Sequence, residues 1–123
     1  MEPRARNGPE RKGSRVFRQG DVLIVPVAEV AVPPSVRALP QQPRDSRGRL
    51  VLALGEVTGH AHAVVGPGTL VRESDEFGRA WLQLTEGGRV VHEEHGTIPL
   101  AKGWYRIVRQ REYTPGSVRV VAD

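Results

Sequence analysis

The sequence contains no cysteine, few aromatic residues (5%) and no long apolar run, and each absence excludes something. Without cysteine there is no disulfide and no thiolate ligand, so any metal site must use histidine and carboxylate side chains. Without about 18 consecutive apolar residues, no membrane-spanning helix is expected. The N-terminal segment also lacks the apolar stretch of a secretory signal, which predicts a cytoplasmic protein.

The 123 residues are enough for one domain with a modest core. The net charge of +4 is carried by residues 1–19, which hold six basic and two acidic side chains, whereas the remaining chain is neutral. Residues 1–15 are rich in arginine, proline and glycine, so we expect a disordered basic arm before a domain over residues 16–123. Such an arm is either simply solvated or binds nucleic acid by displacing counterions from phosphates.

Glycine and proline, with 14 and 10 residues, divide the rest of the chain into short apolar stretches. No window has the 3.6-residue apolar period of an amphipathic helix. The proline-rich residues 28–49 are predicted to form a long loop, which in a compact domain is usually functional or mobile, and residues 97–103 a shorter connection. The fold class is therefore all-β, a small barrel or sandwich. Strands are predicted over residues 16–27, 50–54, 57–65, 69–73, 80–85, 89–94, 104–113 and 117–121.

The chain has four histidines, and they form two pairs, His60-x-His62 and His92-x-x-His95. Side chains alternate along an extended strand, so His60 and His62 share one face and can supply two ligands to one metal. His92 is the expected third ligand, with His95 or Glu94 as the fourth. We therefore predict a histidine-lined pocket that binds a divalent transition metal or a small polar ligand.

This site makes demands on the fold. The segments 57–65 and 89–94 must be neighbouring strands or face each other, and the chain must turn at Glu93-Glu94. Two other interpretations of the histidines stay open: they are structural residues bonded to backbone carbonyls, or two of them act without a metal as the base and acid of a nuclease. In the nuclease, Arg106, Arg109 or Arg111 on a neighbouring strand would hold a phosphate.

An accessory protein that binds RNA or DNA is the main alternative function. Arginines interleaved with tyrosines on the strand 104–113 can hold phosphates and stack on bases, or the arginines can simply pair with nearby glutamates. The basic residues of this alternative lie in the arm, in the loop and on that strand. The residues expected to contact nucleic acid are Arg4, Arg6, Arg11, Lys12, Arg15, Arg37, Arg44, Arg47, Arg49, Arg106, Arg109, Arg111 and Tyr113.

Three sequence blocks, GEVTGHAH, HEEH and RQREY, resemble a family of small uncharacterised bacterial and phage-associated proteins over most of residues 16–123. That resemblance implies no particular chemistry. The pattern of Gly55 and His60-x-His62 is also similar, more remotely, to the start of the cupin metal motif, which would imply a β-sandwich with a metal centre. Cupins carry a glutamate three or four residues after the second histidine, and none stands there in this chain. A residue of the HEEH block would have to take its place.

Overall fold

A computed structural model describes residues 15–55, 57–73 and 79–110, and the regular secondary structure of these residues is almost entirely β. A 3-10 turn, η1 (Glu29–Ala31), and a one-turn helix, α1 (Pro34–Arg37), interrupt the strands. No helix in the described part of the chain is long or apolar enough to cross a membrane. The strands are β1 (Phe17–Gln19), β2 (Val22–Val27), β3 (Leu50–Leu54), β4 (Ala61–Val65), β5 (Gly68–Arg72), β6 (Ala80–Leu84), β7 (Gly88–Val91), β8 (Ile98–Leu100) and β9 (Gly103–Arg109).

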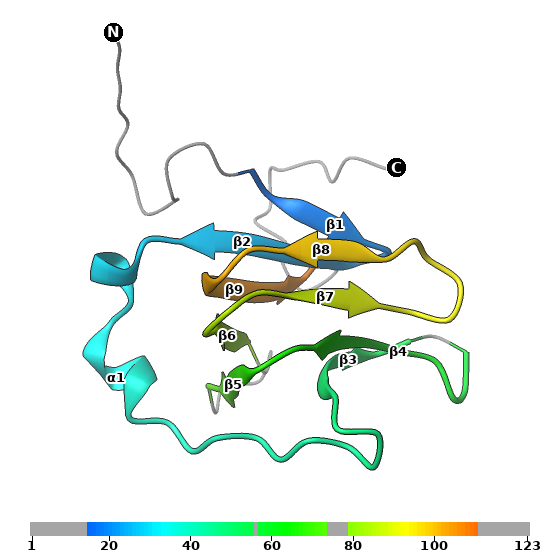
Figure 1. The fold of residues 1–123 in the computed structure, drawn as a ribbon, viewed down its shortest axis with the longest axis horizontal. Helices are drawn as coiled ribbons and strands as arrows, with labels where there is room; N and C mark the ends of the chain where they lie inside the picture. Colours follow the sequence, from blue (N-terminus) through cyan, green and yellow to red (C-terminus); the bar gives the residue numbers. More distant parts are fainter. Residues whose placement is uncertain (1–14, 56, 74–78, 111–123) are drawn as a thin grey trace, which may run out of the picture.

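The strands form two antiparallel sheets (Figure 1). The five-stranded sheet has the order β1-β2-β9-β6-β5, and the four-stranded sheet has the order β3-β4-β7-β8. Neither sheet closes on itself within the described residues, so of the two predicted all-β architectures the molecule adopts the sandwich. Most of the predicted basic arm, residues 1–14, lies outside the described residues.

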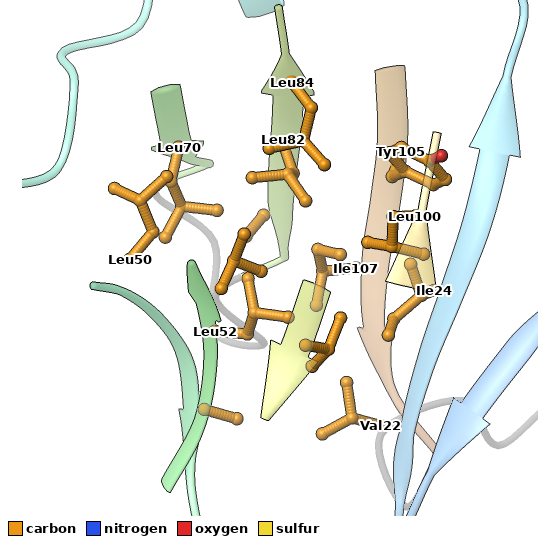
Figure 2. Close-up of a cluster of buried hydrophobic side chains, with 14 residues drawn as sticks. Val22, Ile24, Leu50, Leu52, Leu70, Leu82, Leu84, Leu100, Tyr105 and Ile107 are labelled. Carbon is orange, nitrogen blue, oxygen red and sulfur yellow. The ribbon is translucent and has the colours of Figure 1, made fainter. Parts of the chain in front are cut away.

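The main hydrophobic core lies between the two sheets, because its buried side chains come from both of them. Figure 2 shows Ile24, Leu82 and Ile107 of the five-stranded sheet directed toward Leu52 and Leu100 of the four-stranded sheet. Burying apolar side chains of this size stabilises the fold by about 1.5–3 kcal/mol each. This core sets the distance between the two sheets and therefore the positions of the residues at the ends of their strands.

Residues 28–49 are irregular, as predicted, but they are packed rather than free. Val32 and Val36 are buried against Trp81 and Trp104, which point away from the main core on the outer face of the five-stranded sheet. The guanidinium of Arg37 also lies 5.1 Å from the centroid of the Trp104 ring, a cation–π distance. The segment therefore covers the outer face of the five-stranded sheet. Without it, Trp81 and Trp104 would expose large apolar surfaces to water.

Several predicted strands end earlier or later than the sequence pattern indicated. The strand predicted over residues 16–27, with Gly20-Asp21 as a possible bulge or turn, is the hairpin β1–β2, because the chain reverses at Gly20, whose φ is +60°. The strand predicted over 57–65 begins only at Ala61, after a turn at Gly59 (φ +89°). The connection predicted over 97–103 contains the strand β8. The strand predicted over 117–121 and the end of the one predicted over 104–113 lie outside the described residues.

Candidate functional site

The two histidine motifs meet because β4 and β7 are paired. Their antiparallel register sets Ala63 opposite Val91 and Val64 opposite Val90. The next position in the same register sets His62 opposite His92, and the centroids of these two rings are 4.3 Å apart. The prediction that the strands carrying the two motifs are neighbours is confirmed.

The chain bends immediately after β7, as a shared site requires. Residues 93–95 form the bend, and β8 then returns antiparallel to β7. This brings the His95 ring back to the cluster, with its centroid 4.6 Å from that of His92 and 5.8 Å from that of His62. The predicted turn at Glu93-Glu94 is therefore present.

His92 is the centre of the cluster, because the other three rings all contact it. His60 completes the group, with its ring centroid 5.6 Å from that of His92. A metal–nitrogen bond of about 2.0–2.1 Å puts two imidazole centroids on one ion about 4.5–5.3 Å apart. The observed distances of 4.3, 4.6 and 5.6 Å lie close to that range. The His92 ring therefore lies at about the spacing of two ligands on one ion from each of the other three rings.

The histidines line a pocket of about 300 Å³ at one end of the sandwich. Its other walls are formed by Gly20, Asp21, Gly55, Val57 and Glu94. A Cβ atom on Gly20 would lie 2.9 Å from Nε2 of His95, and one on Gly55 would lie 3.1 Å from Nε2 of His92. Glycine at these two positions therefore leaves room for the imidazoles.

The closest group of potential metal ligands is His60, His92 and Glu93, whose donor atoms lie within 4.8 Å of one another. Glu93 was not predicted as a ligand, because alternation along an unbroken strand directs it away from His92. The bend after β7 removes that alternation. The Glu93 carboxylate accepts a hydrogen bond from the Ala61 N–H (3.0 Å), and this bond lowers its pKa and keeps it ionised.

The predicted fourth ligands are also present at the pocket. A carboxylate oxygen of Glu94 lies 3.7 Å from Nδ1 of His60. The Glu94 backbone N–H donates a hydrogen bond to Nδ1 of His92 (3.0 Å), so the neutral His92 ring carries its proton on Nε2. Desolvation, followed by repulsion from His95, lowers the pKa of His92.

His62 is the buried member of the cluster, with 3% of its surface exposed. It shares a strand face with the core residue Val64, so it points into the space between the sheets. Its Nδ1 lies 2.9 Å from the side-chain oxygen of Gln19 on β1. Desolvation, together with the neighbouring His92, lowers the pKa of His62 to about 4, so the ring is neutral near pH 7.

Asp21 and Arg109 border the same pocket. The Asp21 carboxylate lies 4.0 Å from Nε2 of His62 and accepts hydrogen bonds from Nε and Nη2 of Arg109 (3.3 and 3.0 Å). The acidic partner of Arg109 is therefore an aspartate and not one of the nearby glutamates expected from the sequence. Arg106 is exposed on the opposite face of β9. Sequence analysis did not identify Gln19 or Asp21 as site residues, because neither is part of a recognisable motif: Gln19 ends β1 and Asp21 lies in the turn that follows.

Several basic residues of the loop that the nucleic-acid alternative uses make hydrogen bonds or ion pairs within the domain. Arg44 donates to the carbonyls of Gly48, Gly66 and Gly68, and Arg49 pairs with Asp45 at 2.9 Å. Arg37 donates to the Glu29 carbonyl. Arg15 and Arg47 are exposed. The predicted contacts Arg4, Arg6, Arg11, Lys12, Arg111 and Tyr113 lie outside the described residues.

The fold and the site together define a small antiparallel β-sandwich with a histidine pocket at one end. Residues 18–110 match a family described as a domain of unknown function (DUF8820), and the chain belongs to this family. The match includes all four histidines, Gln19 and Glu93. No curated protein and no solved structure matches the chain, and no relationship to cupins was found.

Proposed function

We propose that the histidine pocket binds one divalent transition-metal ion through His60, His92 and Glu93. The observation that carries this proposal is the proximity of the three donor atoms, all within 4.8 Å of one another. Two histidines and one carboxylate form the ligand set of one class of catalytic zinc sites and of non-haem Fe(II) sites. His62 and His95 line the same pocket, and we propose them as further ligands.

The electrostatics of the pocket support a cation there. The lowered pKa values of His62 and His92 keep both rings neutral near pH 7, which is the form that binds metal. Glu93 is ionised and contributes a negative charge. Protonated imidazoles at such short distances repel one another, whereas neutral rings that bind a metal ion avoid this repulsion.

Binding has one identifiable cost at His92. Its Nδ1 accepts a hydrogen bond from the Glu94 N–H. A metal bound at Nδ1 replaces this hydrogen bond. A metal bound at Nε2 requires the ring proton to move to Nδ1, which also breaks the hydrogen bond. A hydrogen bond of this kind is worth about 0.5–1.5 kcal/mol. This cost is small for a metal ion, since zinc-binding peptides with cysteine and histidine ligands gain about 10 kcal/mol or more on binding.

The test starts from protein purified without a metal-affinity resin, whose metal content is measured by elemental analysis. The metal-free protein is then titrated with Zn²⁺, Fe²⁺ and Co²⁺, and the melting temperature is recorded. We expect one ion per chain and about 2.7 kcal/mol of stabilisation at a ligand concentration of 100 Kd. His60→Ala, His92→Ala and Glu93→Gln should each weaken binding at least tenfold.

Glu86→Gln is the matched control, because it removes an exposed carboxylate beyond the opposite end of β7. Glu86→Gln should bind metal as the unmodified protein does. Binding that is equally strong after His60→Ala and His92→Ala, or the absence of stoichiometric binding to the unmodified protein, would refute the metal site.

A second candidate, acid–base catalysis without a metal, is favoured by one specific observation. The hydrogen bonds of His62 and His92 leave the first ring with a lone pair on Nε2 and the second with a proton there. These are the roles of a general base and a general acid. Cleavage of an RNA substrate in the presence of a chelator, lost in His62→Ala, would support this function over the metal site.

Binding of RNA or DNA remains a prediction. Its clearest test is the salt dependence of binding to a short duplex, since each phosphate contact adds to the slope of affinity against salt concentration.

A further inference from the structure

Gln19 is buried between the sheets, with 2% of its surface exposed, although it does not belong to either histidine motif. It and His62 are the only buried polar side chains in the described part of the chain. A buried amide without hydrogen-bond partners costs about 1–3 kcal/mol, so its contacts explain its position.

The amide group of Gln19 has only one orientation that satisfies its neighbours. Its Nε2 donates to the backbone carbonyls of Gly96 (2.9 Å) and Val90 (3.3 Å). Both partners are acceptors, so the amide nitrogen must face them and the amide oxygen must face His62. The oxygen can only accept, so Nδ1 of His62 carries a proton and donates it to Gln19 across 2.9 Å.

This hydrogen bond decides which atom of His62 is offered to the pocket. A neutral imidazole has one N–H, so with the proton on Nδ1 the lone pair is on Nε2. Nε2 lies 4.0 Å from the carboxylate of Asp21, another residue that lines the pocket. The ring of His62 is therefore held in the tautomer that can bind a metal at the pocket.

The same amide also holds the second motif. Val90 is the last core residue before His92, and Gly96 directly follows His95. By donating to both carbonyls, Gln19 of the five-stranded sheet fixes the two ends of the bend that carries these histidines. One side chain thus contacts the β4 histidine and both sides of the β7–β8 turn.

We infer that Gln19 is a positioning residue for the histidine site, which makes Nε2 of His62 a metal donor and holds the β7–β8 turn in place. This inference rests on the proposed metal function and adds to it a fourth ligand, its donor atom and the residue that sets it. In metal sites, a ligating histidine commonly donates its other N–H to such a partner, and loss of the partner lowers affinity about 10- to 100-fold.

The first arm of the test uses the unmodified protein. Long-range ¹H–¹⁵N NMR of the imidazoles, in a chelator at pH 7, should show His62 with a protonated Nδ1 and an unprotonated Nε2. Addition of Zn²⁺ should move the Nε2 resonance of His62. A His62 ring protonated on Nε2 in the metal-free protein, or an Nε2 resonance that Zn²⁺ leaves unchanged while the protein binds it, would overturn the inference.

The second arm uses Gln19→Met, which keeps the length of the side chain and removes its polar atoms. We expect a 10- to 100-fold loss of Zn²⁺ affinity and a His62 ring that no longer has a single tautomer. Gln83→Met, at a half-buried position on β6, is the control for the same substitution and should leave both unchanged. A folded Gln19→Met protein with unchanged affinity and tautomer would contradict the inference.

The two proposals fail in different ways. If the unmodified protein binds no Zn²⁺, Fe²⁺ or Co²⁺, the metal function and the ligand role of His62 both fail, while the tautomer in the chelated protein still tests the contact with Gln19. If metal binds but His62 Nε2 does not respond, the metal function stands and the inference fails. Should Gln19→Met not fold, the arm that uses the unmodified protein decides.

Discussion

The apolar centre of the sandwich and its histidine-bearing end lie between the same two sheets and are built by the same strands. On β4 the inward-facing residue changes from Val64 to His62 within two positions, and after β7 it changes from Val90 to His92. On β9, Arg109 shares a face with the core residue Ile107. On these strands the backbone continues from one region into the other while the inward-facing side chains change, and the turn before β4 and the bend after β7 add His60, Glu93 and His95 at the end.

The difference shows what each region demands of the sequence. The centre needs apolar side chains that fill space, and many such side chains serve equally well. The end buries His62 and Gln19, and these need partners at specific distances. Burying a polar group costs desolvation free energy, which is offset only when the group makes its hydrogen bonds. The first region supplies stability, and the second holds polar, titratable groups in fixed positions.

The largest expected effect is the difference in the free energy of unfolding between a variant in the apolar core and a variant at the pocket. Leu82→Ala, at a fully buried core position, should lower the free energy of unfolding by about 2–5 kcal/mol because it leaves a cavity. His60→Ala, at the half-buried edge of the pocket, should change it by less than about 1 kcal/mol in a chelator. Urea unfolding of the two variants measures both values. Equal losses would mean that the pocket is part of the stabilising core.

The next largest effect is a pH dependence of the free energy of unfolding, which we expect His62 to cause. The pKa of His62 is about 4 in the folded protein, against an ordinary value of 6.5. Above pH 6.5 both states are neutral, and the group adds no pH dependence. Between pH 6.5 and 4 the unfolded chain binds the proton and the folded chain does not, so stability falls by about 3 kcal/mol and then levels off.

Chemical unfolding in a chelator from pH 7 to pH 4 measures this loss. His62→Gln, which lacks the titrating ring, should show a smaller decline over the same range. A decline of the same size in His62→Gln would assign the pH dependence to other groups.

The smallest expected effect tests whether the absence of a side chain at Gly20, which lines the pocket, is needed for metal binding. Gly20→Ala and Gly48→Ala both introduce a Cβ at positive φ (+60° and +79°), and each should cost about 1 kcal/mol. Only the Cβ at position 20 would approach the histidines, at 2.9 Å from Nε2 of His95, whereas nothing lies within 4 Å at position 48. Zn²⁺ titration should show weaker binding for Gly20→Ala alone. Equal affinities in the two variants would show that Gly20 only forms the turn.

The sequence by itself determined the all-β class, through short apolar stretches between glycine and proline turns. It also determined that the two histidine motifs are the candidate site, because no other part of the chain gathers four possible ligands. The strand pattern and the histidine spacing are local properties, since periodicity and spacing act over a few residues. The pairing of the two strands and the turn at Glu93-Glu94 were predicted only as conditions for a shared site.

Only the tertiary structure decided which residues complete the site. Glu93 joins His60 and His92 because the bend ends the alternation of the strand, and Gln19 reaches His62 from the opposite sheet across 43 positions of sequence. The choice of sandwich over barrel was decided in the same way, by sheet edges that stay unclosed within the described residues. Contacts between sheets depend on how the whole core packs, and no pattern within a single strand encodes them.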